Sequence, residues 1–229
     1  ADYILGTIII VPAVLIVFIE YVVPFFRSLV TSFMVDNAFS LANYEVVKTQ
    51  YLENIFYTIF LSVTSLFFVM LISVIVGGYL SIHTDKVIEF FFKIPLFIPF
   101  VVVGHAMRVF LAPKGLLNVL LAQIGLIDIN NPPEIAFGAV GTIVALTWKQ
   151  MAFALLLVMG AFRTVDKSYL EAARNFGASS LKQIRDILIP LSLPTIRVSA
   201  ILIFTSFLQN FSVVMMMGKG SGPRHIMID

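Results

Sequence analysis

The sequence predicts an all-α bundle of membrane-spanning helices, and three observations support this fold class. The 229 residues are 59% hydrophobic and only 12% charged, whereas soluble domains are about 25% charged. The mean hydropathy is +1.00. Five apolar stretches are each long enough to cross the hydrocarbon layer as a helix of about 20 residues. None of them alternates apolar and polar residues with period two, so membrane strands are disfavoured.

We expect the whole chain, residues 1–229, to form one transmembrane domain with five spans. In chain order they cover residues 4–26, 55–80, 90–111, 135–162 and 191–217.

The connecting segments indicate how the chain is oriented in the membrane. Residues 81–89 and 163–189 hold six Lys and Arg in 36 residues, whereas 27–54, 112–134 and 218–229 hold five in 63. Lys and Arg concentrate in cytoplasmic loops. We therefore place residues 163–189 and the N-terminal end inside, and the C-terminal end outside. A sixth span returning to the cytoplasm is expected beyond Asp229.

Segment 112–134 contains one further helical pattern. Residues Gly115–Ile124 are apolar on one side, too short to span, and bracketed by Pro113 and Pro132. They predict either an amphipathic helix at the membrane interface or a loop helix packed on the bundle.

Residues 163–189 are unusually charged and still keep apolar residues at helical spacing. Ser168 with Glu171 reads as a capping box that starts a short helix, and Gly177 as its end. Ser180 reads as a second cap. Pro190 suits the first turn of the fifth span. The sequence thus predicts a helix–turn–helix elbow on the membrane surface. Pro194, one turn later, is expected to kink the fifth span.

A longer pattern runs through this elbow. Glu171-Ala172-Ala173 is followed after three residues by Gly177, and after nine more by Ile187-Leu188-Ile189-Pro190. This pattern resembles the EAA motif of permease subunits of type I ABC importers, and departs from it only at Ile189, where Leu is usual. The resemblance implies a bacterial inner-membrane permease whose short helix couples to an ATPase.

The resemblance also implies site residues and partners. Leu170, Glu171, Ala172, Ala173 and Gly177 would contact a cytoplasmic ATPase dimer. Pro190 would stiffen the connection to the fifth span. An extracytoplasmic binding protein would deliver the substrate, and a second permease chain, expected to be a different one, would complete the pathway.

The chain itself offers no catalytic chemistry. It has no G-x-x-x-x-G-K-[ST] phosphate-binding loop and no H-E-x-x-H or G-x-S-x-G motif. We therefore expect a transport subunit without enzyme activity or cofactor of its own, with ATP and Mg²⁺ bound by the ATPase. With no Cys and three His, a metal site is not expected. The net charge of +2 gives no reason to expect nucleic acid. An ATPase-independent channel or transporter is the alternative class, but it leaves the elbow without a role.

Polar side chains inside the spans are candidates for the translocation path, because they are costly in lipid. All but Trp148 have a structural alternative: an interfacial position for Glu20, pairing with a neighbouring helix for His105, Arg108 and Lys149, and helix–helix packing for Gln209 and Asn210. The candidates are Glu20, His105, Arg108, Trp148, Lys149, Gln209 and Asn210.

The substrate branch is indicated by further resemblances. Residues 170–179, and residues 114–118 with 125–128, resemble permeases of the spermidine/putrescine type, within a branch that also includes thiamine, iron and phosphonate importers. Trp148-Lys149 instead resembles sugar permeases, which carry oligosaccharides or glycerol phosphates. A polyamine site would need carboxylates, and the predicted spans supply only Glu20.

Overall fold

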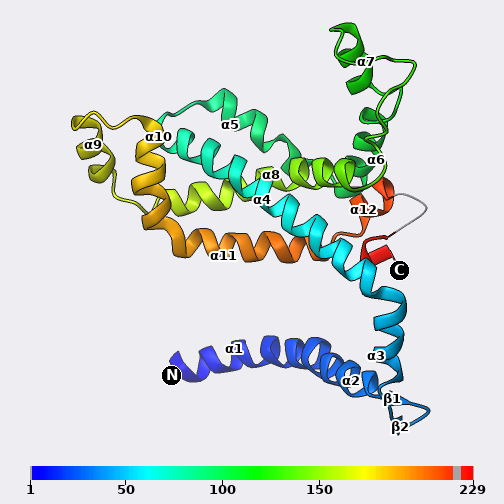
Figure 1. Cartoon of the computed structure of the whole chain (residues 1–229). Coiled ribbons are helices and arrows are strands. Elements are labelled where there is room, and N and C mark those ends of the chain that lie inside the picture. Colours follow the sequence, from blue (N-terminus) through cyan, green and yellow to red (C-terminus); the bar gives the residue numbers. More distant parts are fainter. Residues whose placement is uncertain (1, 219–222, 229) are drawn as a thin grey trace. The chain divides into compact units, whose positions relative to one another are not determined.

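The computed structural model describes residues 2–218 and 223–228 (Figure 1). The described chain consists mostly of helices and separates into two compact units, with the boundary along the chain between Glu53 and Asn54.

The first unit is a long helix followed by a hairpin and a second helix. The turn of the hairpin is formed by Asp36 and Asn37, with φ angles of 52° and 63°. Positive φ angles at both central residues are typical of tight two-residue hairpin turns, whose twist matches the twist of the paired strands. The side-chain amide of Asn43 donates to the carbonyl oxygens of Ser32 and Met34 and so fastens the hairpin. The elements are α1 (Asp2–Val17), the π turn η1 (Phe18–Val22), α2 (Val23–Ser32), β1 (Met34–Val35), β2 (Ala38–Phe39), α3 (Ala42–Val46) and the π turn η2 (Val47–Tyr51).

The second unit is a helix bundle around a central helix, α8. It contains α4 (Leu52–Ile82, apart from its first two residues), α5 (Lys86–Lys93), η3 (Ile94–Phe97), α6 (Phe100–Phe110), α7 (Leu116–Gln123), α8 (Ala139–Phe162), α9 (Lys167–Asn175), α10 (Ser180–Gln183), the π turn η4 (Ile184–Leu188), α11 (Ile189–Leu208), α12 (Ser212–Met217) and η5 (Ile226–Ile228).

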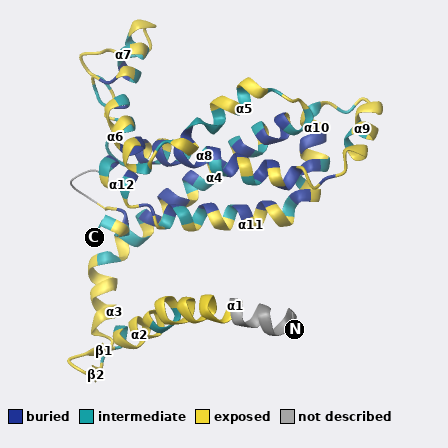
Figure 2. Ribbon diagram, turned by 180° about the vertical axis from the view of Figure 1, so that it is seen from behind, coloured by how far each residue is buried: buried dark blue, intermediate teal, exposed yellow. Residues whose placement is uncertain are grey.

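The core of the second unit lies along α8, which Figure 2 shows as the most continuously buried helix. Small residues such as Ala145 and Ala154 alternate with Leu146 and Val158 on its buried faces. Small side chains allow neighbouring helix backbones to approach closely. The main hydrophobic cluster joins α8 to α4, α11 and α12.

Four described helices are long and apolar enough to span a membrane: Ile10–Ser32, Ala42–Ile82, Ala139–Phe162 and Ser180–Leu208. A fifth span is formed if the bent pair Lys86–Phe97 and Phe100–Phe110 is counted as one. The predicted helical membrane bundle is therefore confirmed.

The predicted third span is not a straight helix. Its two halves meet at 107°. Pro95 and Pro99 lie at this break, where neither can donate a backbone hydrogen bond, and Ile98 takes the extended conformation that a following proline favours. The span predicted over residues 90–111 is therefore bent at the two prolines.

The predicted fifth span is also shifted. Its helix begins at Ser180, passes through Pro190 and ends at Leu208, whereas residues 209–217 form a break and the short α12. Pro190 lies in the first turn of α11, as predicted, but the helical backbone continues before it into the π turn η4. The π turn η4 lies immediately before Ile189 and widens the helix there. Such a wider turn accommodates a proline, which cannot donate the backbone hydrogen bond of a regular helix.

The predicted helix in segment 112–134 is present as α7. Leu117 packs against the main core, whereas Leu116 and Leu120 are exposed. The buried amide of Asn118 donates to the carbonyl oxygens of Ala112, Pro113 and Pro133. One face of α7 is therefore fastened to the flanking loops and to α6, and an apolar face is left uncovered.

Candidate functional site

The charged elbow contains the short helix α9, and its N-terminus is capped by Asp166. The Asp166 carboxylate accepts a hydrogen bond of 2.9 Å from the backbone N–H of Ser168. This bond is the main cause of the lowered pKa of Asp166, and a hydrogen bond from the Ser168 side chain is the second cause. The predicted Ser168 cap was wrong, because Asp166 already has the extended backbone that a capping residue needs.

The end of α9 lies where the sequence predicts it. Gly177 has a φ of +78°. Its N–H donates to Arg174 O, and the N–H of Ala178 donates to Ala173 O, both at 2.9 Å. These two bonds form a Schellman motif, which needs a left-handed residue that glycine supplies without strain.

The next helix is capped by Ser179, whose hydroxyl accepts from the N–H of Lys182. The predicted cap, Ser180, is one residue too late. Its hydroxyl is instead hydrogen-bonded at 2.9 Å to Nε2 of His83, which follows α4. Gln183 also donates to Ala178 O. The exit of the elbow is therefore fastened to the end of α4 as well as to itself.

Close packing fastens the elbow further. A Cβ atom added to Gly78 of α4 would lie 2.7 Å from the side chain of Ile184. Glycine therefore permits an approach between α4 and η4 that alanine would obstruct. Ile184 belongs to a buried cluster with Val158 and Phe162 of α8.

The predicted coupling residues divide between two faces of α9. Leu170 and Ala173 are half-buried, and Leu170 packs on the cluster beside Phe162. Glu171 and Ala172 are exposed, and Figure 2 shows most of α9 as exposed. Gly177 and Pro190 are also exposed.

Phe176 is a residue that the sequence analysis did not single out as a site. Its side chain is 93% exposed at the end of α9. A phenylalanine directly before the motif glycine, in a charged loop, was the available signal. Exposed aromatic anchors are typical of partner contacts.

Lys149 lies on α8 and is 7% exposed. Its ammonium donates to the carbonyl oxygens of Pro95 at 2.7 Å and Ile98 at 2.6 Å. It also lies 4.7 Å from the centroid of the Phe100 ring. Of the two predicted roles, the structure shows pairing with the neighbouring broken helix.

Gln209 and Asn210 lie at the break between α11 and α12. Asn210 is buried, and its side-chain oxygen accepts from the N–H of Val213, which caps α12. Gln209 is exposed. Both line a cavity of about 270 Å³ together with Phe100, Ser206, Phe211 and Ser212.

This cavity combines amide, hydroxyl and aromatic groups at a helix break. Ser206 is hydrogen-bonded to the side-chain amide of Gln150, and Phe100 is the ring that faces Lys149. Sequence reasoning missed Phe100, Ser206 and Phe211, because only the fold brings the start of α6 to the end of α11. Such a mixed lining is typical of a small-solute site.

The other predicted path residues lie apart from this cavity. His105 and Arg108 are exposed on α6, and the Arg108 guanidinium lies 5.0 Å from the centroid of the Phe137 ring. Trp148 lines a separate apolar groove of about 460 Å³ with residues of α4 and α8, including Phe68 and Val144.

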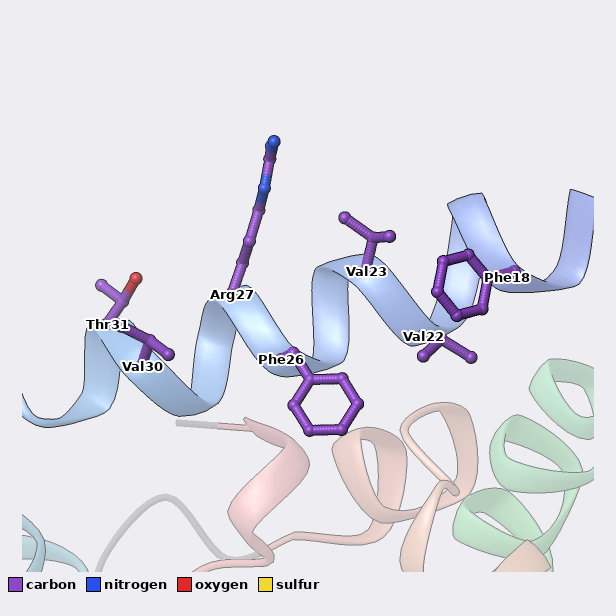
Figure 3. A pocket seen from close by; sticks show the side chains of 7 residues that line it. All are labelled: Phe18, Val22, Val23, Phe26, Arg27, Val30 and Thr31. Atoms are coloured by element: carbon purple, nitrogen blue, oxygen red, sulfur yellow. The ribbon is translucent and has the colours of Figure 1, made fainter. Parts of the chain in front are cut away.

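Glu20 is exposed in the π turn η1 of the first unit. A depression of about 500 Å³ lies along the same helix, and Glu20 does not line it. Figure 3 shows that its seven lining side chains all come from this one helix. The depression is therefore an open helix face, and Arg27 is its one charged residue.

Comparison with known proteins gives a consistent result. Residues 39–228 match the family model described as "Binding-protein-dependent transport system inner membrane component". The spermidine/putrescine transport system permease protein PotB of Escherichia coli (strain K12) is 27% identical over 202 residues, which cover 85% of this chain and 70% of PotB.

A second relative is the sulfoquinovosyl glycerol transport system permease protein SmoG of Agrobacterium fabrum. It is 32% identical over 111 residues, covering 48% of this chain and 35% of SmoG. A bacterial ABC transporter that imports the acidic polysaccharide alginate has a chain of similar fold. The TM-score is 0.75 and the identity is 20%, over 96% of this chain and 78% of that chain.

Proposed function

Because the chain belongs to the family of binding-protein-dependent transport system inner membrane components, we propose that its helix α9 docks on a cytoplasmic ATPase. The chain is a permease subunit of a bacterial ABC importer in the inner membrane. The observation that supports the docking proposal is the 93% exposed ring of Phe176. It lies at the end of a helix whose opposite face is attached to the bundle.

The division of α9 into two faces suits this role. Leu170 holds the helix on the cluster formed by α8 and η4, so a force on the outer face of α9 is passed to these two elements. Glu171 and Ala172 remain available to a partner. A small residue such as Ala172 lets a partner surface approach the helix closely, while Phe176 fills a pocket as an aromatic anchor.

ATP hydrolysis then belongs to the partner, with ATP and Mg²⁺ bound there. We further propose that a second, different permease chain completes the pathway and that an extracytoplasmic binding protein delivers the substrate.

We propose a polyamine, within the wider branch of small polar solutes, as the substrate class. The similarity to PotB over 85% of the chain supports this assignment. The rings of Phe100 and Phe211 line the cavity at the helix break, and aromatic faces attract cations.

A sugar is the second candidate, and a specific observation favours it. The six described residues that line this cavity include no carboxylate. Aromatic rings beside the Gln209 amide and the serine hydroxyls suit a sugar ring and its hydroxyl groups.

Copurification of the ATPase tests the docking proposal. Phe176→Ala and Glu171→Lys are each expected to reduce the ATPase recovered with the permease by at least about tenfold, as is usual for loss of an interface anchor. Leu181→Ala removes another exposed apolar side chain of the same elbow and serves as the matched control. Normal ATPase recovery and transport in both test variants would contradict the proposal.

Ligand identification tests the substrate class. Native mass spectrometry of the copurified binding protein is expected to show a bound polyamine, and a bound sugar would establish the second candidate instead. Gln209→Ala is expected to raise the substrate concentration for half-maximal uptake. Gln123→Ala, which removes an exposed glutamine of α7, is expected to leave it unchanged.

A further inference from the structure

A polar cavity of about 240 Å³ lies beside α9, apart from the cavity at the α11–α12 break. It is enclosed by the end of α4, the start of α5, the end of α8 and the start of α9. The lining includes Ser81, Thr84, Phe162, Arg163, Lys167 and Leu170. No predicted role of the elbow uses this space.

The lining of the cavity carries two cations, Arg163 and Lys167, and both side chains are exposed. Among the described residues, the side chains of Arg163 and Lys167 have no ion pair or hydrogen bond. Glu89 also lines the cavity, but its carboxylate is paired with Lys93 one turn along α5. The neighbouring Asp166 carboxylate is occupied by the N–H of Ser168. Two cations therefore face the cavity without a partner.

Two hydroxyl groups add hydrogen-bonding capacity. Ser81 donates to the carbonyl oxygen of Gly77 at 2.6 Å, so its hydroxyl is held in place at the wall. The Thr84 hydroxyl has no hydrogen bond among the described residues and is free to donate to an anion. A fork-shaped guanidinium, an ammonium and a hydroxyl donor together match the oxygens of a phosphate group.

The level of the cavity relative to the membrane indicates the source of a phosphate group that would bind there. Phe162 is the last residue of the 24-residue span formed by α8, and a span of this length matches the hydrocarbon layer, so we infer that the cavity lies near the level at which this layer ends. Three of its lining residues are apolar side chains of α4 and α8, Leu80, Met159 and Phe162. Phospholipid phosphates lie at this level, and anionic lipids enrich the cytoplasmic leaflet.

We propose that this cavity binds a phosphate group, held by Arg163, Lys167 and Thr84. The phosphate belongs to an anionic phospholipid or to a soluble phosphate compound. The cytoplasmic position of the cavity rests on the proposed docking of α9. Because Leu170 of α9 forms part of the wall, an occupied cavity supports the coupling helix from behind.

Native mass spectrometry of the purified permease complex tests this site. The probes are phosphatidylglycerol and phosphatidylcholine with the same acyl chains, each added alone and in competition with inorganic phosphate. Removal of one cation by Arg163→Gln or Lys167→Gln is expected to weaken phosphatidylglycerol binding about fivefold, and removal of both about 25-fold. The double variant Lys86→Gln with Lys182→Gln changes net charge equally at exposed positions outside the cavity, and is expected to leave binding unchanged.

The outcomes separate the possible ligands. Loss of phosphatidylglycerol in the cavity variants alone assigns the site to a lipid, and displacement by inorganic phosphate assigns it to a soluble phosphate. The proposal is overturned if the cavity variants retain both lipids equally, or if the control variant loses as much phosphatidylglycerol as the cavity variants. If the variant that lacks both Arg163 and Lys167 fails to assemble, Thr84→Val and the two single cavity variants are compared with the control instead. ATPase recovery is measured on the same samples, so lipid binding that persists without ATPase binding contradicts only the proposed function.

Discussion

The ammonium nitrogen of Lys149 lies 2.7 Å from the carbonyl oxygen of Pro95. The third span breaks at this point, and a break inside a membrane leaves carbonyl oxygens without helical partners. Lys149 satisfies two of them, at Pro95 and Ile98. From the sequence, the charge of Lys149 suggests a residue of the transport path. In the structure it stabilises the bent helix.

Lys149→Met is therefore expected to destabilise the second unit. The loss of hydrogen bonds from a charged donor, with two carbonyl groups left unpaired, costs about 2–4 kcal/mol. Thermal unfolding in lipid nanodiscs measures this, and Lys182→Met, at an exposed lysine, is the control. If Lys149→Met changed substrate preference without changing stability, Lys149 would be a path residue instead.

Asn118→Ala is expected to loosen segment 112–134. Its amide donates to three carbonyl oxygens that hold α7 and the flanking loop together, and their loss costs about 1–3 kcal/mol. Limited proteolysis should show faster cleavage within this segment. Asn130→Ala, at an exposed asparagine of the same segment, should leave the cleavage rate unchanged. Equal cleavage of the two variants would refute the role of Asn118.

Gly177→Ala is expected to weaken the end of α9 without any clash. A Cβ atom there meets nothing within 4 Å, so the cost comes only from the positive φ and is about 1 kcal/mol. Gly177→Asn should cost less, because asparagine tolerates this conformation. Gly160→Ala, at a helical glycine with equal space, should be neutral or stabilising. Hydrogen exchange of the α9 amides compares the three, and similar exchange in the Ala and Asn variants would contradict the argument.

The capping of α9 by Asp166 is expected to depend on pH. The folded pKa lies below the ordinary value of 3.8 because the charged carboxylate accepts a backbone hydrogen bond. The cap therefore stabilises α9 fully above the ordinary value and is lost as the pH falls through the lowered pKa. Asp166→Asn keeps an acceptor and should remove this pH dependence. Helix content of the two proteins across the acid range measures it, and identical acid profiles would be inconsistent with this cap.

The sequence predicts those features of the elbow that depend only on local chemistry. Gly177 ends α9 as predicted, because a left-handed residue after a short amphipathic helix is a local requirement. The caps were misplaced by one or two residues, since Asp, Ser and Thr compete for the same position. Leu170 and Phe176 could not be assigned to opposite faces, because that depends on how α8 packs behind the helix.

The spans show a similar limit. Hydropathy identifies where apolar segments lie, but it does not distinguish a straight span from one bent at Pro95 and Pro99. Lys149 and Gln209 both read as polar residues inside spans, and only the fold shows that Lys149 pairs with the bent helix while Gln209 lines a cavity. That distinction depends on contacts between residues far apart in the sequence.

Site-specific crosslinking most directly tests the claim that α9 docks on an ATPase. The chain contains no cysteine, so Phe176→Cys introduces a single reactive thiol at a 93% exposed position. In membranes that hold the whole transporter, a thiol-reactive photocrosslinker at this position is expected to capture the ATPase subunit. The same probe at Leu120→Cys on α7 should not. Capture from both positions, or from neither while transport continues, would contradict the coupling role of α9.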